Sequence, residues 1–419
     1  MFEADHCYAA MRTRDPRFDG IFYVAVSSTG IYCRPVCPAP TPRRDRCTFF
    51  RSAADAERAG YRACRRCRPE RAPGNAPSDA RARLVRRALS RFDSGAMSYG
   101  GLDDLAHTLG VTDRHLRRAF VEELGVAPLR LAHMPEPKVA LEARPPFDGA
   151  GVLAFLAARA LPGIERVTHD SYTRTLSLGE RRGVVTVGLA GDAGVTVAVS
   201  PSLVPVLVQV VARVRRLMDL DAHPLDIDAH LAADPLLARS VAAHPGLRVP
   251  GTLDPFELAV RVVLGQQVSV AAARTLATRL AATFGDAIDA AELGTVFPTA
   301  ATLAAIDPER LREIGLTRAR AATVHALAVA VSEERVELDA GADPAEVVEQ
   351  LDALPGIGPW SAEMIAMRAI GWPDAFPAGD LGVRRRFGAK TEAAARAAAS
   401  RWRPWRSYGV LHLWTTESP

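Results

Sequence analysis

Two short pairs of cysteines near the amino terminus have the spacing of metal ligands. Three residues separate Cys33 from Cys37, two separate Cys64 from Cys67, and 26 lie between the pairs. Two such pairs at this distance are typical of a tetrahedral zinc site with four thiolate ligands. We therefore expect one Zn²⁺ per chain, bound by these four cysteines.

The spacing alone leaves the role of this metal open. Zinc can stabilise the fold of a domain whose hydrophobic core is too small for the domain to fold without metal, and the spacing favours that structural role. Zinc also keeps a thiolate deprotonated at neutral pH, and the thiolate is the nucleophilic form of cysteine. All six cysteines lie in the first 67 residues, and no apolar export signal is expected, so disulfides are disfavoured. Cys7 and Cys47 have no partner at ligand spacing and are interpreted as ordinary thiols.

A second group that could carry chemistry is an aspartate near the carboxy terminus. The segment Leu351–Ala366 places Leu-Pro-Gly-Ile-Gly between two helical runs, which predicts a hairpin between helices. Gly356 and Gly358 allow a tight turn, and the amides at the start of the next helix can face a DNA phosphate. Asp380 follows Gly358 by 22 residues. On its own, Asp380 could also be the cap of a helix.

A pair of short helices is expected between these two regions. In Gly101–Phe120, the residues Ala106, Gly110 and Leu116 have the spacing of a small residue, a turn glycine and a buried apolar residue in a helix-turn-helix. An ordinary helical hairpin is the alternative, and spacing does not separate the two. The second helix, expected at 112–123, carries four basic residues that could reach DNA: Arg114, His115, Arg117 and Arg118.

The elements that must position these groups fall into four predicted domains. Breaks rich in Pro and Gly are expected at Arg71–Ser78 and Met134–Phe147, and a strand hairpin is expected where Gly183–Leu189 meets Val195–Val199. From about Leu225 the pattern is Ala/Leu-rich and helical. The predicted domains are residues 1–75, 79–133, 144–222 and 223–419.

Charge is distributed unevenly along the 419 residues. Residues 1–91 contain 19 Arg, no Lys and nine acidic residues, so their formal charge is +10, whereas the whole chain carries +4. A basic segment of this kind favours a polyanionic partner such as the DNA backbone, although an Arg-rich solvated face is the alternative. The longest apolar stretch, Gly151–Leu161, is interrupted by Arg159 and is shorter than the ~20 residues of a membrane span. We expect no membrane partner.

The residues around the cysteines resemble a known family. Thr29–Cys37 (TGIYCRPVC) and Gly60–Pro69 (GYRACRRCRP) are similar to the amino-terminal domain of the Ada methylphosphotriester-repair family. The resemblance implies that Cys33 accepts a methyl group from a methylated DNA phosphate and stays on zinc as a thioether. Gly101–Phe120 also resembles the first helix-turn-helix of AraC-type regulators. That family has two such motifs, but the chain reaches Pro135 soon after the first, so we expect only one.

The hairpin and Asp380 together resemble the helix-hairpin-helix glycosylase superfamily. Arg144–Gly183, Pro250–Val270 and Arg401–Trp414 are similar to bacterial 3-methyladenine DNA glycosylase II, the AlkA type, so the resemblance covers residue 144 to the end. It implies a small α/β subdomain followed by an all-helical body. Asp380 is then the expected catalytic carboxylate, since a carboxylate near the anomeric carbon stabilises the positive charge that develops on the sugar.

The same resemblance implies how a damaged base is bound. Trp414 is expected to stack on the flipped base and Trp360 to line its pocket, with cation–π attraction favouring cationic alkylated purines. Gln267 stands where the AlkA type has a Leu that wedges into the vacated stack, and Met364 replaces an aromatic pocket residue. Bifunctional relatives use a Lys after the hairpin, but no Lys lies between residues 139 and 389. A glycosylase without a lyase step is therefore expected.

The expected protein is thus a multi-domain, mainly α chain with a small four-cysteine zinc α/β module, a short helix-turn-helix, an α/β subdomain and an all-α glycosylase body. The expected function is repair of alkylated double-stranded DNA, by base excision and by methyl transfer to Cys33, with possible regulatory DNA binding. The alternative is an alkylation-responsive transcription regulator whose glycosylase part only holds DNA. A monomer in the bacterial cytoplasm, associated with the nucleoid, is expected.

Overall fold

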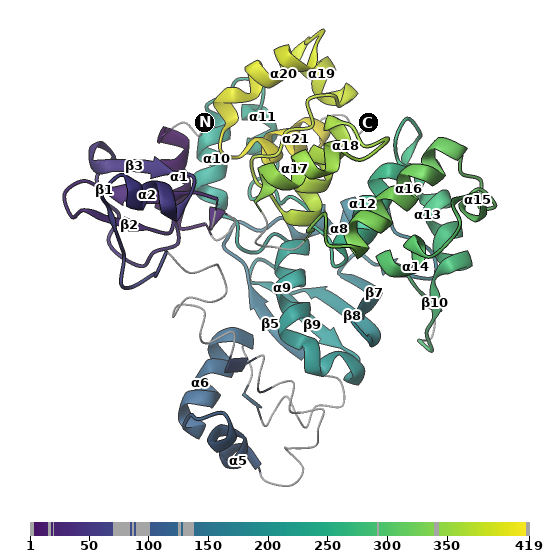
Figure 1. The fold of residues 1–419 in the computed structure, drawn as a ribbon, viewed down its shortest axis with the longest axis horizontal. Helices are drawn as coiled ribbons and strands as arrows, with labels where there is room; N and C mark the ends of the chain where they lie inside the picture. Colours follow the sequence, from purple (N-terminus) through teal and green to yellow (C-terminus); the bar gives the residue numbers. More distant parts are fainter. Residues whose placement is uncertain are drawn as a thin grey trace.

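Figure 1 shows the fold of the protein, which is a computed structural model. Two large clusters of buried apolar side chains and one smaller cluster organise the described residues. The predicted linker Arg71–Ser78 lies outside the described residues, and so does the first part of the Pro-rich break that begins at Met134. The structure describes residues 4–15, 18–19, 21–69, 84–85, 88, 101–124, 127–128, 138–290, 293–338 and 343–415.

The cysteine-rich region forms a small α/β module. Its sheet has the order β3-β1-β2-β4, in which β1 is antiparallel to β2 and β3, and β2 is parallel to β4. Cys7 and Cys47 lie in its hydrophobic core, and burial raises the pKa of the Cys7 thiol to about 12, as fits ordinary thiols. The elements are α1 (Ala4–Thr13), β1 (Tyr23–Val26), β2 (Ile31–Cys33), η2 (Arg44–Arg46), β3 (Cys47–Phe50), α2 (Ala53–Arg58) and β4 (Arg62–Ala63).

Helix α1 lies between this module and the helical body (Figure 1). Its Cys7, Ala10 and Met11 belong to the core of the module, while Ala9 packs against the core of the body. Trp372 of the body packs against both cores. The two regions are therefore joined by apolar contact and not only by the chain between them.

The two helices predicted in Gly101–Phe120 are α5 (Gly101–Thr108) and α6 (Asp113–Leu124). Gly110 adopts φ +71° between them, a conformation that favours glycine, and Leu116 is fully buried. The hydroxyl of Thr112 accepts a hydrogen bond from the amide of His115, which starts the second helix. Both helices share one hydrophobic cluster with the neighbouring sheet.

That sheet has five strands, all antiparallel, in the order β5-β9-β8-β7-β6. The predicted hairpin is the β8–β9 pair, and β5 shows that the sheet begins before residue 144. Helices α8 and α9 contact the sheet. The elements are β5 (Lys138–Glu142), α8 (Gly149–Ala157), β6 (Glu165–Val167), β7 (Ser171–Leu178), β8 (Arg181–Leu189), β9 (Gly194–Val199), η4 (Pro201–Val206) and α9 (Leu207–Leu217).

The rest of the described chain is a helical body, with one small departure from the all-α expectation. The short strands β10 (Asp286–Ala287) and β11 (Thr295–Val296) pair with each other, and the carbonyl of Thr295 accepts a hydrogen bond from Thr175 of β7. The helices are α10 (Pro224–Ala232), α11 (Ala238–Ala243), α12 (Pro255–Leu264), α13 (Val270–Phe284), α14 (Ala300–Ala304), α15 (Pro308–Leu311), α16 (Arg318–Ser332), α17 (Pro344–Asp352), α18 (Pro359–Ile365), the π-helix η5 (Ala366–Ile370), α19 (Leu381–Phe387), α20 (Glu392–Ala398), η6 (Ala399–Trp402) and α21 (Arg406–Thr415).

A buried ionic cluster joins the five-stranded sheet to α12. Arg174 of β7 lies between Glu257 of α12 and Glu165 of β6, and all three side chains are almost completely buried. Arg261, one turn after Glu257, pairs with both carboxylates at 2.9 and 3.0 Å. Because each buried charge has a partner of opposite sign, the cluster fixes the orientation of the sheet against the body without leaving an isolated charge.

Candidate active site and zinc centre

The predicted hairpin connects α17 to α18 in a conformation that its glycines make possible. Gly356 adopts φ +81°, and a Cβ at this position would come within 2.0 Å of the Thr323 hydroxyl on α16. Glycine is therefore required at this residue both by its backbone angle and by the close approach of α16. Gly358 directly precedes α18, whose first residue is Pro359.

Asp380 caps α19 and at the same time receives two indole N–H groups. Its Oδ1 accepts hydrogen bonds from the amide of Val383 at 3.1 Å and from Trp414 Nε1 at 3.3 Å. Its Oδ2 accepts from Trp360 Nε1 at 3.4 Å. The helix cap, which was the alternative interpretation of this residue, and a position between two tryptophans are thus both present. Three donors hold the carboxylate in one orientation.

A cavity of about 1470 Å³ opens beside this carboxylate. It is bounded by the hairpin, by the turn between α12 and α13, and by the start of α19. The structure therefore brings together, around one space, residues from segments that lie far apart in the sequence. The lining residues predicted from the sequence are Gln267, Gly356, Gly358, Trp360, Met364, Asp380 and Trp414.

The other tryptophans have different surroundings. Trp402 and Trp405 are buried in the core of the body, and Trp402 donates a hydrogen bond to Asp234. Trp372 packs at the contact with the zinc module. Of the five tryptophans, only Trp360 and Trp414 line this cavity.

Five cavity-lining arginines were not predicted from the sequence as site residues: Arg159, Arg261, Arg274, Arg368 and Arg385. The guanidinium groups of Arg159 and Arg368 lie over the ring of Phe155, at 3.7 and 4.7 Å from its centroid. Burial lowers the pKa of Arg159 to about 10 and that of Arg368 to about 9. One signal for Arg159 was available, because it interrupts the apolar run Gly151–Leu161. Arg368 lies in a helical segment with no distinguishing pattern.

Gln267 lies exposed at the edge of the cavity with φ +56°. This left-handed conformation is unusual for a residue with a side chain, and no sequence pattern indicated it. Met364, by contrast, is buried in the wall of the cavity on α18.

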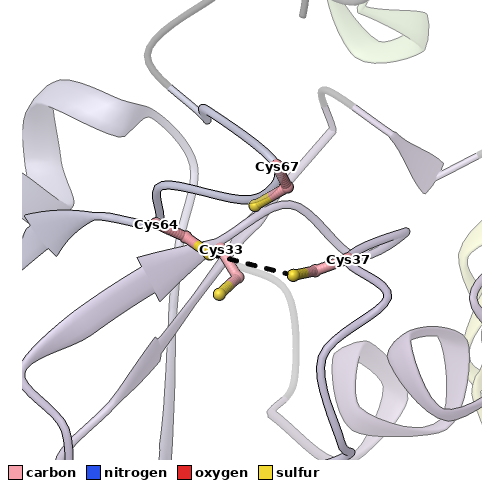
Figure 2. Close-up of side chains that lie close together, drawn as sticks. All are labelled: Cys33, Cys37, Cys64 and Cys67. Atoms are coloured by element: carbon pink, nitrogen blue, oxygen red, sulfur yellow. Dashed lines mark hydrogen bonds between the residues drawn. The ribbon is translucent and has the colours of Figure 1, made fainter. Parts of the chain in front are cut away.

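The four predicted cysteine ligands meet at one end of the small sheet. Figure 2 shows Cys33 at the end of β2, with Cys37, Cys64 and Cys67 around it. All four sulfur atoms lie within 4.8 Å of one another. Four thiolates on a tetrahedral zinc ion at about 2.3 Å have sulfur atoms about 3.8 Å apart, so the cluster fits zinc after small adjustments. The chain therefore has a zinc centre with four cysteine ligands.

The four ligands differ in their exposure to solvent. Cys37, Cys64 and Cys67 are buried, whereas Cys33 is only partly buried. The amide of Arg34 donates to the sulfur of Cys67 at 3.4 Å. Between Cys64 and Cys67 lie two exposed arginines, Arg65 and Arg66. Cys33 is thus the ligand that another molecule can reach most easily, next to a basic surface.

The three predicted DNA-contacting arginines of the helix-turn-helix are all exposed on α6. Arg117 pairs with Asp113, one turn earlier on the helix, at 3.5 Å. Such an exposed pair contributes little stability, so it leaves Arg117 able to exchange partners. Arg114 and Arg118 lie on the same helix.

Within the residues that the structure describes, none of the helices combines the length and the apolar character needed to cross a membrane.

Comparison with protein-family models identifies three parts of the chain. Residues 6–70 match the metal binding domain of Ada, residues 138–254 the AlkA N-terminal domain, and residues 260–401 the HhH-GPD superfamily of base excision DNA repair proteins. The last two matches contain the five-stranded sheet and most of the helical body, and the first contains all four zinc ligands.

One relative aligns with nearly the whole of this chain. The chain is 38% identical over 480 aligned positions to the probable bifunctional transcriptional activator/DNA repair enzyme AlkA of Mycobacterium tuberculosis, covering 98% of this chain and 96% of the relative. Since 480 positions exceed the 419 residues of this chain, the relative has segments that this chain lacks. DNA-3-methyladenine glycosylase 2 of Escherichia coli is 39% identical over 275 residues, covering 65% of this chain and 95% of the relative.

Solved structures support the fold of the glycosylase part. The 3-methyladenine DNA-glycosylase from Archaeoglobus fulgidus has a TM-score of 0.55 at 22% identity and covers 66% of this chain and 97% of its own. MBOgg1 in complex with a low affinity DNA ligand has a TM-score of 0.53 at 21% identity, covering 67% and 94%. The chain therefore belongs to the family of bifunctional AlkA-type proteins in which the metal binding domain of Ada and a helix-hairpin-helix base excision repair domain are joined.

Proposed function

We propose that the protein repairs alkylated double-stranded DNA and that its carboxy-terminal body is a glycosylase for alkylated bases of the 3-methyladenine type. The observation that carries this proposal is the carboxylate of Asp380, held by two indole N–H groups at the edge of a cavity large enough for a nucleoside. A carboxylate in this place stabilises positive charge at the anomeric carbon of a flipped nucleotide and orients the attacking water. The names of the relatives support this reaction.

Base binding follows from the same geometry. Trp414 supplies the flat face on which the flipped base stacks, and Trp360 closes the pocket beside it. Met364 gives the wall a flexible apolar side chain. The positive groups of Arg159 and Arg368 can stabilise the base as it leaves with the electron pair of the broken bond. Because a neutral lesion leaves as an anion, which these positive groups stabilise, we expect neutral lesions to be accepted in addition to cationic alkylated purines.

The reaction ends at hydrolysis. A lyase step requires an amine that forms a Schiff base with the sugar, and no Lys occurs between residues 139 and 389. The product is then an abasic site in an intact strand. The direct test uses duplex DNA treated with a methylating agent: free 3-methyladenine should appear, and strands should break only after later treatment with alkali. Breaks before alkali treatment would refute the hydrolase assignment.

The zinc centre carries the second proposed activity, which is stoichiometric. The Cys33 sulfur attacks the methyl carbon of a methylated phosphate, an S–C bond forms, and the C–O bond breaks to leave a phosphodiester with its negative charge. Zinc bound by Cys33, Cys37, Cys64 and Cys67 keeps the thiolate deprotonated at neutral pH. Four thiolates on Zn²⁺ have a net charge of −2, and methylation reduces this to −1. Repulsion of DNA therefore falls after transfer, so methylation of Cys33 should strengthen DNA binding.

Regulation of transcription is the second candidate function. It is favoured by the exposed arginines of α6, Arg114, Arg117 and Arg118, and by the name of the relative from M. tuberculosis. As an alternative, the chain would be an alkylation-responsive regulator in which the glycosylase part only holds DNA. Promoter binding by the methylated and unmethylated protein separates the two: affinity that does not change on methylation argues against regulation.

The organisation that we propose for these activities has four parts: a zinc methyl-acceptor domain at 1–75, a single helix-turn-helix at 79–133, a glycosylase α/β subdomain at 144–222 and the glycosylase domain at 223–419. Strand β5 (Lys138–Glu142) extends the α/β subdomain before residue 144. Gly356 and Gly358 of the hairpin contact the DNA backbone, and Gln267 enters the vacated base stack. The protein acts as a monomer in the cytoplasm, on the DNA of the nucleoid.

A further inference from the structure

The turn between α12 and α13 carries an unusual backbone conformation at its most exposed point. Gln267 adopts φ +56°, a region that disfavours residues with a Cβ atom, and it stands at the edge of the cavity. An exposed side chain in this conformation requires surrounding contacts that hold it there. Those contacts lie on the preceding residue, Gln266.

Gln266 is held on both its backbone and its side chain. The Arg320 guanidinium, on the first turn of α16, donates from Nη2 to the Gln266 carbonyl at 2.7 Å. This carbonyl belongs to the peptide group between Gln266 and Gln267, so the hydrogen bond fixes the plane on which φ of Gln267 depends. The Gln266 side chain donates from Nε2 to the carbonyl of Gly356 and to the hydroxyl of Ser361, both at 2.9 Å.

Helix α16 therefore supports the turn and the hairpin together. Its Arg320 holds the carbonyl of Gln266, and its Thr323, three residues later, lies against Gly356 of the hairpin. Thr323 is itself fixed, because its hydroxyl donates to the carbonyl of Ala319 at 3.0 Å. The exposed Gln267 and the hairpin consequently keep a constant separation and orientation.

We propose that Arg320 and Gln266 form a latch that presets Gln267 in its left-handed conformation before DNA binds. The inference rests on the proposed function, in which the hairpin holds the DNA backbone and Gln267 fills the gap left by a flipped base. Arg320 is then a positioning residue, because it acts through Gln267 and is not among the residues that line the cavity. Without it, Gln267 relaxes to more favourable backbone angles, and only a fraction of molecules is ready to insert its side chain.

The effect should appear in base flipping and not in bond cleavage. In Arg320→Met, which keeps the apolar stem but removes the donors, we expect single-turnover excision of 7-methylguanine paired with cytosine to fall about tenfold. Excision of the same base from a single-nucleotide bulge, which is already unstacked, should stay within about twofold. Arg318→Met on the same helix is the matched control, because Arg318 is exposed and its partner is Glu309, away from the turn. It should leave both rates unchanged.

A second variant tests whether the latch acts through the backbone conformation of Gln267. Asn adopts left-handed angles more readily than Gln and keeps a side-chain amide, so Gln267→Asn should need the latch less. In that background, Arg320→Met should slow excision from the paired duplex by no more than about threefold. Two results would overturn the latch. One is that Arg320→Met slows excision equally on paired and on bulged DNA. The other is that Arg320→Met slows excision as much with Asn at position 267 as with Gln.

Failure of the latch can be told apart from failure of the proposed function. Fluorescence of 2-aminopurine placed beside the lesion reports flipping without any need for bond cleavage. If Arg320→Met leaves this signal as large as in the unchanged protein, the latch is wrong even though excision proceeds. If no base is released from the bulged substrate by the unchanged protein, the glycosylase assignment is wrong whatever the fluorescence shows.

Discussion

The indole Nε1 of Trp414 donates a hydrogen bond to Oδ1 of Asp380 over 3.3 Å. This hydrogen bond thus joins the residue that is proposed to stack on the base to the residue that is proposed to act on the sugar. We expect a base on the face of Trp414 to place its sugar next to the Asp380 carboxylate, so that one pair of side chains both binds and orients the nucleotide. Trp360 donates to the other oxygen and keeps the carboxylate from rotating.

Trp414→Phe separates the two roles of this side chain. Phenylalanine keeps an aromatic face but lacks the N–H donor, so kcat should fall about tenfold while KM changes little. Trp414→Ala also removes stacking and should raise KM about 10- to 100-fold. The matched control is Trp405→Phe, because Trp405 is buried outside the cavity and its N–H has no hydrogen-bond partner among the described residues. Equal changes in kcat and KM in Trp414→Phe and Trp405→Phe would contradict the proposed role of the hydrogen bond between Trp414 and Asp380.

Loss of one zinc ligand should remove methyl transfer and leave base excision in place. In Cys37→Ala, three thiolates remain, and we expect the bound zinc measured by mass spectrometry to fall well below one per chain. Transfer of labelled methyl groups from methylated DNA to the protein should then be lost. Cys47→Ala is the control, because Cys47 lies in the core of the same module but outside the metal cluster. Continued methyl transfer by Cys37→Ala without zinc would argue against a metal-activated thiolate.

Site residues that depend on local sequence patterns were predicted, whereas residues that depend on contacts between distant parts of the sequence were not. The zinc ligands and the hairpin were predictable, because short spacings and turn glycines encode them locally, whereas the role of Asp380 was inferred from the resemblance to the glycosylase superfamily. Arg320 was not, because its partner Gln266 lies 54 residues away and only the fold joins them. The same holds for Arg368, whose Nε donates to the carbonyl of Pro250 across 118 residues.

The fold was predicted with similar limits. Strands β8 and β9 follow from alternating residues around a short turn, as the sequence indicated. Strand β5 (Lys138–Glu142) was missed because it lies inside the Pro-rich break predicted at Met134–Phe147, and pairing with β9 rather than its own pattern makes it part of the sheet. The left-handed backbone of Gln267 could not be predicted, since Gln has no preference for that conformation.

Removal of Arg174 should destabilise the whole glycosylase part. Arg174→Met leaves Glu165 and Glu257 buried with one cation fewer, and we expect a loss of about 3–5 kcal/mol in the free energy of unfolding by denaturant. Arg312→Met breaks an exposed pair with Glu309 and should change stability by less than about 1 kcal/mol. If the two variants unfolded at the same denaturant concentration, the buried cluster would not be what holds the sheet to α12.

Buried His412, two residues before Trp414, should make stability depend on pH. Burial, with a smaller contribution from His244, lowers the pKa of His412 to about 4. In the unfolded chain its pKa is about 6.5, so the unfolded state binds the proton first as pH falls. Neutral His412 therefore makes its full contribution to the free energy of unfolding above about pH 6.5. This contribution, about 3 kcal/mol, is lost as the pH falls toward 4.

This pH effect can be measured by thermal unfolding at several pH values. The difference in stability between the unchanged protein and His412→Asn should narrow as the pH is lowered from 7.5 to 4.5. His169→Asn is the control substitution, because His169 is exposed on the surface. Parallel curves for the unchanged protein and His412→Asn would show that His412 titrates normally in the folded state.

The most direct test of the account is release of 3-methyladenine from methylated duplex DNA by Asp380→Asn. Asparagine can still cap α19, so the variant should fold and bind damaged DNA, but it lacks the negative charge. Asp343→Asn is the control, since Asp343 caps α17 in the same way and lies outside the cavity lining. We predict that Asp380→Asn releases the base at least about 100-fold more slowly, while Asp343→Asn acts like the unchanged protein. Release by Asp380→Asn at the unchanged rate would contradict the central claim that this carboxylate is the catalytic group.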